Sequence, residues 1–139
     1  MIIDALKHHT DAVGTVPEHR GVGVLVVEDE MIVAAVIEAI LYDAGYHVLG
    51  PFYSPKDGLE AIGTFRPDVA LLDMSLTRGT SFELADELDR RSIPFVLVSG
   101  TPCGMLEGRY QNRPFLTKPF GISELLKTIE AVARVDVQA

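Results

Sequence analysis

The stretch VGVLVVEDE, residues 22–30, joins a short apolar run to three consecutive acids. Its β-branched residues and unbroken apolar character are typical of a strand buried on both faces of a parallel sheet. Three later runs have the same form and end in a polar residue: VALLD at 69–73, FVLVS at 95–99 and FLTK at 115–118. We therefore expect the strand ends to bring acids, a hydroxyl and an ammonium group together.

Helical segments alternate with these strands, which predicts parallel strands with helices on both faces, a doubly wound α/β fold. Ligands of such sheets bind at the carboxyl ends of the strands, where the polar residues lie. The remaining elements are a brief strand at His47–Leu49 and helices at Met31–Ala44, from Ser54-Pro55 to about Phe65, from the capping box at Thr80 to about Arg91, and at Ile122–Val135. The last helix is predicted to be amphipathic, with its apolar face formed by Ile122, Leu125, Leu126, Ile129 and Val132.

One segment interrupts the alternation. The stretch Gly100–Pro114 should hold a helix before the last strand, but it contains three glycines and two prolines. These residues are poor helix formers, so we predict that the fourth helix is short or irregular.

Composition limits the class of protein. A chain of 139 residues is one domain, and its net charge of −8 argues against nucleic acid as a partner. The chain lacks a long apolar run for a membrane span and an apolar signal segment, and the lone Cys103 suits a reducing compartment, so we expect the cytoplasm. Residues 1–20 are predicted to be a partly disordered extension, and 21–139 the domain.

The strand-end residues suit phosphoryl chemistry. Glu28 and Asp29 can hold a hard divalent cation, and Asp73 can attack phosphorus once a metal offsets the charges. Ser99 can donate a hydrogen bond to a phosphoryl oxygen, and Lys118 can neutralise its charge. Each residue alone has an ordinary alternative as a solvated polar group, and only the set of them favours the site.

The pieces VLVVEDE, VALLDMSL, PFVLVSG and FLTKPF resemble the receiver domain of bacterial two-component response regulators, from Val22 to about Arg134. The resemblance implies a five-stranded flavodoxin-like sheet of order 2-1-3-4-5 and Mg²⁺ or Mn²⁺ as cofactor. For the metal, it implies Asp29 and Asp73 as direct ligands, Ser75 as a ligand through its carbonyl, and Glu28 as a ligand through water. Asp73 would also be the phospho-acceptor. Ser99 would be the switch hydroxyl, Phe115 the switch aromatic, and Lys118, followed by a cis-proline at Pro119, the phosphoryl-binding lysine.

The chain departs from the family pattern in two places. Thr77 replaces a proline usual after the phosphorylation site, and the interval from Ser99 to Lys118 is a few residues short. The broken fourth helix makes the chain resemble, loosely, an atypical receiver subgroup named for a FATGUY signature. The output face of the family is built partly from the fourth helix, so these departures concern that face rather than the phosphorylation site.

We expect a stand-alone receiver, because only residues 136–139 follow the last predicted helix and only a short extension precedes the domain. The resemblance implies that it is phosphorylated by a histidine kinase or phosphotransfer protein and then signals to a protein, relays the group or acts as a sink. It is not expected to be a classical enzyme, but to phosphorylate itself from a phosphodonor and to dephosphorylate slowly. A pseudo-receiver that is never phosphorylated and a phosphatase with an aspartate nucleophile are the alternatives. Dedicated phosphatases place an acid two residues after the nucleophile, where this chain has Ser75.

The helix Met31–Ala44 has few charges, which predicts contacts on more than one side. Residues 33, 36, 37, 40 and 41 can face the sheet, which leaves residues 32, 35, 39 and 42 toward the flank or outside. We expect the N-terminal extension, a homodimer partner or the kinase to cover this side, with ordinary wide burial as the alternative.

Overall fold

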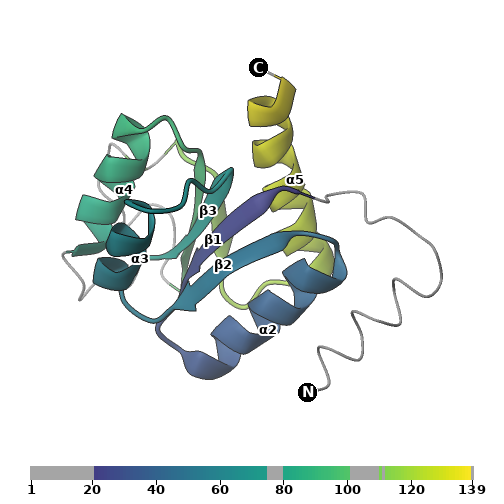
Figure 1. Ribbon diagram of the computed structural model, residues 1–139. Coiled ribbons are helices and arrows are strands. Elements are labelled where there is room, and N and C mark those ends of the chain that lie inside the picture. The colour runs from purple at the N-terminus through teal and green to yellow at the C-terminus, as the bar shows by residue number, and fades with distance from the viewer. Residues whose placement is uncertain (1–20, 75–79, 101–109, 111, 139) are drawn as a thin grey trace.

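The computed structural model describes residues 21–74, 80–100, 110 and 112–138. Its five strands form one parallel sheet in the order β2-β1-β3-β4-β5, as predicted (Figure 1). The strands are β1 (Gly23–Val27), β2 (His47–Phe52), β3 (Val69–Asp73), β4 (Phe95–Ser99) and β5 (Phe115–Thr117). The helices are α2 (Met31–Asp43), α3 (Pro55–Ala61), α4 (Thr80–Arg90) and α5 (Ile122–Gln138).

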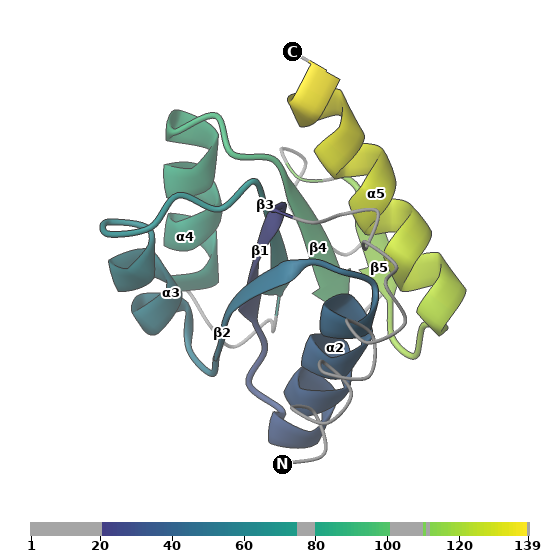
Figure 2. The ribbon, with the colours of Figure 1, turned by 45° about the vertical axis from the view of Figure 1, so that its right-hand side comes forward.

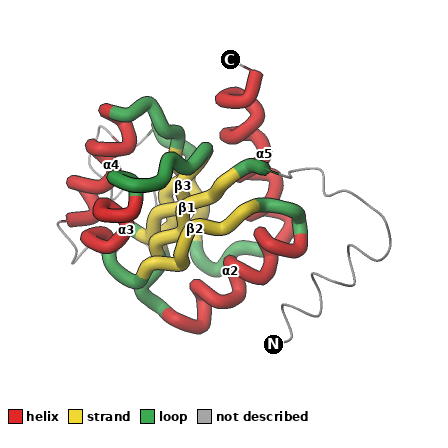
Figure 3. Tube along the Cα trace, in the orientation of Figure 1, coloured by secondary structure: helices red, strands yellow, loops and turns green. Residues whose placement is uncertain are grey.

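Helices cover both faces of the sheet, with α3 and α4 on one face and α2 and α5 on the other (Figures 1 and 2). The strands form the middle layer in Figure 3. Alternate residues of each strand enter opposite cores, because successive side chains of a strand point to opposite faces. Leu25 of β1 packs in the α3/α4 core, for example, and the next residue, Val26, packs in the α2/α5 core. This double burial explains why the strands are apolar throughout.

Three elements, β2, α3 and α5, differ clearly from their predicted bounds, and α5 ends at Gln138 rather than Val135. Strand β2 extends to Phe52 rather than Leu49, because it continues through Gly50 and Pro51 with a change of register against β1. Gly50 has φ +103°, a backbone conformation that favours glycine. Helix α3 begins as predicted, with Ser54 Oγ accepting a hydrogen bond from the Asp57 amide at 3.2 Å, but it ends at Ala61 rather than Phe65. Residues 62–64, which follow the helix, form turns instead.

The buried faces of two helices also differ from prediction. Val36 of α2 was expected to face the sheet but is 52% exposed, and the small Ala34 is buried there instead. Ile122 was expected on the buried face of α5 but is 61% exposed, because it lies at the start of the helix, one turn before the buried Leu125.

Most of the segment predicted to hold a short fourth helix lies outside the described residues. Within it, Tyr110 is buried and stacks on Phe82 of α4 with ring centroids 5.5 Å apart. Its hydroxyl donates a hydrogen bond to Asp86 Oδ1 at 2.9 Å, which ties the approach to β5 to helix α4.

Candidate functional site

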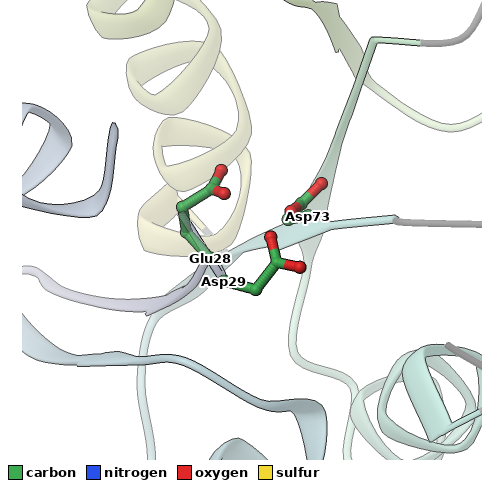
Figure 4. Close-up of side chains that lie close together, drawn as sticks. All are labelled: Glu28, Asp29 and Asp73. Carbon is green, nitrogen blue, oxygen red and sulfur yellow. The ribbon is translucent and has the colours of Figure 1, made fainter. Parts of the chain in front are cut away.

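Three carboxylates meet at the carboxyl end of the central strands. Glu28 and Asp29 follow β1, and Asp73 is the last residue of the neighbouring β3. Each offers an oxygen to one group in which all three oxygens lie within 4.8 Å of one another. Figure 4 shows the side chains of Asp29 and Asp73 ending close together, with Glu28 beside them. The sequence prediction that these acids gather at one sheet edge is therefore confirmed.

The backbone fixes Glu28 inside the protein. Its amide donates to the carbonyl of Phe52 at 2.9 Å, and its Oε2 accepts from the Glu30 amide at 3.0 Å. Its side chain is 2% exposed. Its Oε1 forms an ion pair with the ammonium group of Lys118 at 2.9 Å. A buried carboxylate at this position is also a suitable acceptor for a metal-bound water.

The surroundings of Asp73 disfavour the ionised form of its carboxyl group. Burial raises the pKa of Asp73 from 3.8 to about 7, and two further effects act in the same direction: the hydrogen bond that protonated Asp73 donates to Asp29, and the negative charge of Glu28. The charge of Lys118 opposes this rise in pKa. A divalent cation would stabilise the ionised carboxylates that now repel one another.

Lys118 supplies the positive charge of the site. Its Nζ lies 2.9 Å from Glu28 Oε1, 3.0 Å from Glu30 Oε1 and 3.6 Å from Asp73 Oδ2. Partial burial lowers the pKa of Lys118, but the hydrogen bonds with Glu28 and Glu30 and the charge of Asp73 outweigh it and raise the pKa above its usual value. The ammonium group therefore stays charged at neutral pH.

The other predicted site residues are placed as follows. Ser99 ends β4 and is 3% exposed, and its carbonyl accepts from the Lys118 amide at 2.9 Å. Phe115 begins β5 and is half-buried against the α3/α4 core. The Lys118–Pro119 peptide bond is cis, as the resemblance implied. Ser75 lies outside the described residues, as do Thr77 and Cys103.

One residue of the site was missed by sequence reasoning. Glu30 was treated only as an extension of the acidic run, yet its carboxylate pairs with Lys118 across 88 residues of chain. Its position next to the acid pair was the available signal, but the sequence does not show in which direction an exposed side chain points.

A family model described as the response regulator receiver domain matches residues 24–130. This chain belongs to the response regulator receiver family. The receiver is 29% identical over 130 residues to the transcriptional regulatory protein PdtaR of Mycobacterium tuberculosis, covering 90% of this chain and 62% of that protein. It is 30% identical over 119 residues to response regulator RR06 of Streptococcus pneumoniae, covering 80% of this chain and 52% of that protein. The chain thus spans less than two thirds of the length of these relatives.

Solved structures agree with the family. The receiver superposes with a TM-score of 0.71 and 26% identity on the signal receiver domain of a modulated diguanylate cyclase from Desulfovibrio desulfuricans, covering 84% of this chain and 96% of that one. It superposes with a TM-score of 0.69 and 27% identity on the chemotaxis protein CheY4 of Vibrio cholerae, covering 80% and 98%. None of the helices in the described part of the receiver has the length and apolar character needed to cross a membrane.

The receiver also has an apolar groove beside the site. It has a volume of about 500 Å³ and lies between α2 and the β5–α5 connection. Its walls include the apolar residues Ile32, Val36, Phe120 and Ile122, and the charged residues Glu30 and Lys118 also line it. Of the four α2 residues that were predicted from sequence to lie toward the flank or outside, Ile32 alone lines the groove, and the other α2 residues in its walls, including Val36, were expected to face the sheet.

Proposed function

We propose that this receiver accepts a phosphoryl group on Asp73 from a histidine kinase or a phosphotransfer protein, in a reaction that depends on Mg²⁺ or Mn²⁺. The observation that supports it is the juxtaposition of Asp73 with two further carboxylates and an ammonium group. The burial of the Glu28 carboxylate and the raised pKa of Asp73 both fit a site that binds a cation. Asp29 would bind the cation directly, Glu28 through water, and Ser75 through its carbonyl.

In the proposed reaction a carboxylate oxygen of Asp73 forms a bond to phosphorus, and the bond from phosphorus to the donor breaks. With a phosphohistidine donor, the electron pair of that bond returns to the imidazole nitrogen, which can then take a proton from solvent. A cation held by these carboxylates would supply positive charge to the phosphoryl oxygens. Lys118 and the hydroxyl of Ser99 then donate hydrogen bonds to those oxygens. Phe115, the switch aromatic at the start of β5, responds to this change.

The decisive experiment is incubation with Mg²⁺ and acetyl phosphate, followed by intact-mass measurement. Wild type should gain the mass of one phosphoryl group, and Asp73→Asn should gain none. Phosphorylation that persists in Asp73→Asn would place the acceptor elsewhere. No gain from any donor would favour the pseudo-receiver, and continuous release of phosphate from external substrates would favour the phosphatase.

We further propose that the phosphodonor protein docks over the groove beside α2, because this apolar groove is lined in part by Lys118 of the site. A charge at Ile32, whose side chain is 82% exposed, should disturb docking without disturbing the fold. Ile32→Asp should therefore slow transfer from a donor protein that phosphorylates wild type, while leaving the rate with acetyl phosphate unchanged. Equal slowing with both donors would argue against docking here. An altered oligomeric state of Ile32→Asp would favour a homodimer partner as the occupant of the groove.

After phosphorylation, we propose that the domain 21–139 signals to another protein or passes the phosphoryl group to it.

A further inference from the structure

The ammonium group of Lys118 lies nearer to the β1–α2 connection than to Asp73. Its distances to Glu28 Oε1 and Glu30 Oε1 are 2.9 and 3.0 Å, while its distance to Asp73 Oδ2 is 3.6 Å. The first two are direct charge-assisted contacts, and the third is longer than a good hydrogen bond. In this state Lys118 is therefore held mainly by acids other than the proposed phospho-acceptor.

Glu30 is the exposed member of this group. Its side chain is 62% exposed, against 2% for Glu28 and 18% for Lys118. Glu30 is the N-cap residue of α2, but its side chain makes no capping hydrogen bond and contacts Lys118 instead. Its amide meanwhile donates to Glu28 Oε2. One residue thus orients a buried carboxylate through its backbone and pairs with the lysine through its side chain.

We propose that Glu30 is a positioning residue that holds Lys118 toward the β1–α2 connection while Asp73 carries no phosphoryl group, and so slows phosphorylation. This inference rests on the proposed function. The two direct contacts hold the Nζ of Lys118 toward Glu28 and Glu30, so Lys118 must move toward Asp73 to donate to a phosphoryl oxygen. Glu30 is the partner that gives way, because water can hydrate its exposed carboxylate after the movement.

The proposal sets the direction and size of the effect. Glu30→Gln keeps the length of the side chain but removes the charge that competes for Lys118. Loss of a mostly exposed ion pair corresponds to a change of about two- to fivefold in an equilibrium or rate constant. We expect phosphorylation to become faster by that factor. The acceleration should shrink at high salt, because salt already screens an exposed pair.

A second variant separates the contact from the charge alone. Glu30→Asp keeps the negative charge but shortens the side chain by one methylene, so the carboxylate cannot keep its 3.0 Å contact with Lys118 from the same backbone position. Glu30→Asp should therefore also accelerate phosphorylation. Glu38→Gln, two turns further along α2, is the matched control for removing one negative charge from this helix.

The test measures phosphorylation rates with acetyl phosphate and Mg²⁺ by intact mass, and the NMR signal of the Lys118 ε-methylene in the metal-free protein. The proposal predicts faster rates and a moved Lys118 signal in both Glu30 variants, and neither change in Glu38→Gln. A wild-type rate in Glu30→Gln or Glu30→Asp, or equal acceleration in Glu38→Gln, would overturn it.

The two readouts also separate the failure of this inference from that of the proposed function. If wild type takes no phosphoryl group, the proposed function fails, and with it the claim that Glu30 slows phosphorylation. If wild type is phosphorylated but the Lys118 signal does not move in Glu30→Gln, only the Glu30 inference fails.

Discussion

Replacing Asp73 with asparagine should stabilise the metal-free protein at neutral and alkaline pH. The reason is the pKa of Asp73, which burial and the two neighbouring acids raise from 3.8 to about 7. Above that pH the folded protein holds an ionised carboxylate that its surroundings disfavour. Asparagine has nearly the same shape and no charge, so it removes the penalty.

The magnitude follows from the pKa. A rise from 3.8 to about 7, if expressed fully, corresponds to about 4 kcal/mol of unfolding free energy. Water still reaches part of the site and the neighbouring acids titrate together with Asp73, so we expect about half of this, roughly 2 kcal/mol. The gain should be complete above about pH 7 and should fall as the pH is lowered, because the wild-type carboxyl then becomes protonated in the folded state. Below about pH 4 the carboxyl is protonated in both states and the two proteins should be equally stable.

Urea unfolding followed by circular dichroism, with a chelator present, measures this difference across the pH range. Asp43→Asn, at an exposed position at the end of α2, controls for the loss of one negative charge. Added Mg²⁺ should stabilise wild type and not Asp73→Asn, because a ligand that binds the folded state raises its stability. An asparagine variant less stable than wild type at pH 8, or a gain that does not change with pH, would refute the reasoning.

Three further substitutions test the packing that supports the site. Gly50→Ala should cost about 3 kcal/mol in urea unfolding, since φ is +103° and a Cβ would lie 2.7 Å from a backbone nitrogen. Gly58→Ala in α3 should destabilise by about 1 kcal/mol despite the better helix propensity of alanine, because its Cβ would lie 2.8 Å from Val27 Cγ2; a rise in melting temperature would contradict this. Tyr110→Phe should cost about 1–2 kcal/mol by removing the hydrogen bond to Asp86, and an unchanged unfolding midpoint would show that this bond contributes nothing.

The sheet and the gathering of acids were predictable from sequence, and the reasons are physical. Apolar runs that end in a polar residue identify buried parallel strands, and parallel strands in such a fold place their carboxyl ends at one edge. Chain direction alone places Asp73 at the same edge as Glu28 and Asp29, and the strand order implied by the family resemblance places β3 next to β1. Neither step required knowledge of side-chain rotamers.

What could not be predicted depends on neighbours distant in sequence. Strand β2 continues through Gly50 and Pro51 because β1 beside it accommodates a change of register, which the local residues do not reveal. The exposure of Val36 depends on how α2 is rotated against the sheet, and a periodic pattern defines that rotation only to within a residue or so. The contact of Glu30 with Lys118 depends on one exposed rotamer.

The position of β1 has a consequence for how the site can respond. Strand β1 is hydrogen-bonded to β2 on one side and β3 on the other, and all five of its residues are buried. Its amides should exchange with solvent deuterium only when the whole domain unfolds, so β1 should be among the most slowly exchanging segments. The acids that follow β1 therefore sit on a nearly immobile support. A structural change that follows phosphorylation of Asp73 must therefore occur in backbone segments whose hydrogen bonds open more often. Strand β5 has three residues and lies at the edge of the sheet, so deuterium uptake should change first around β5.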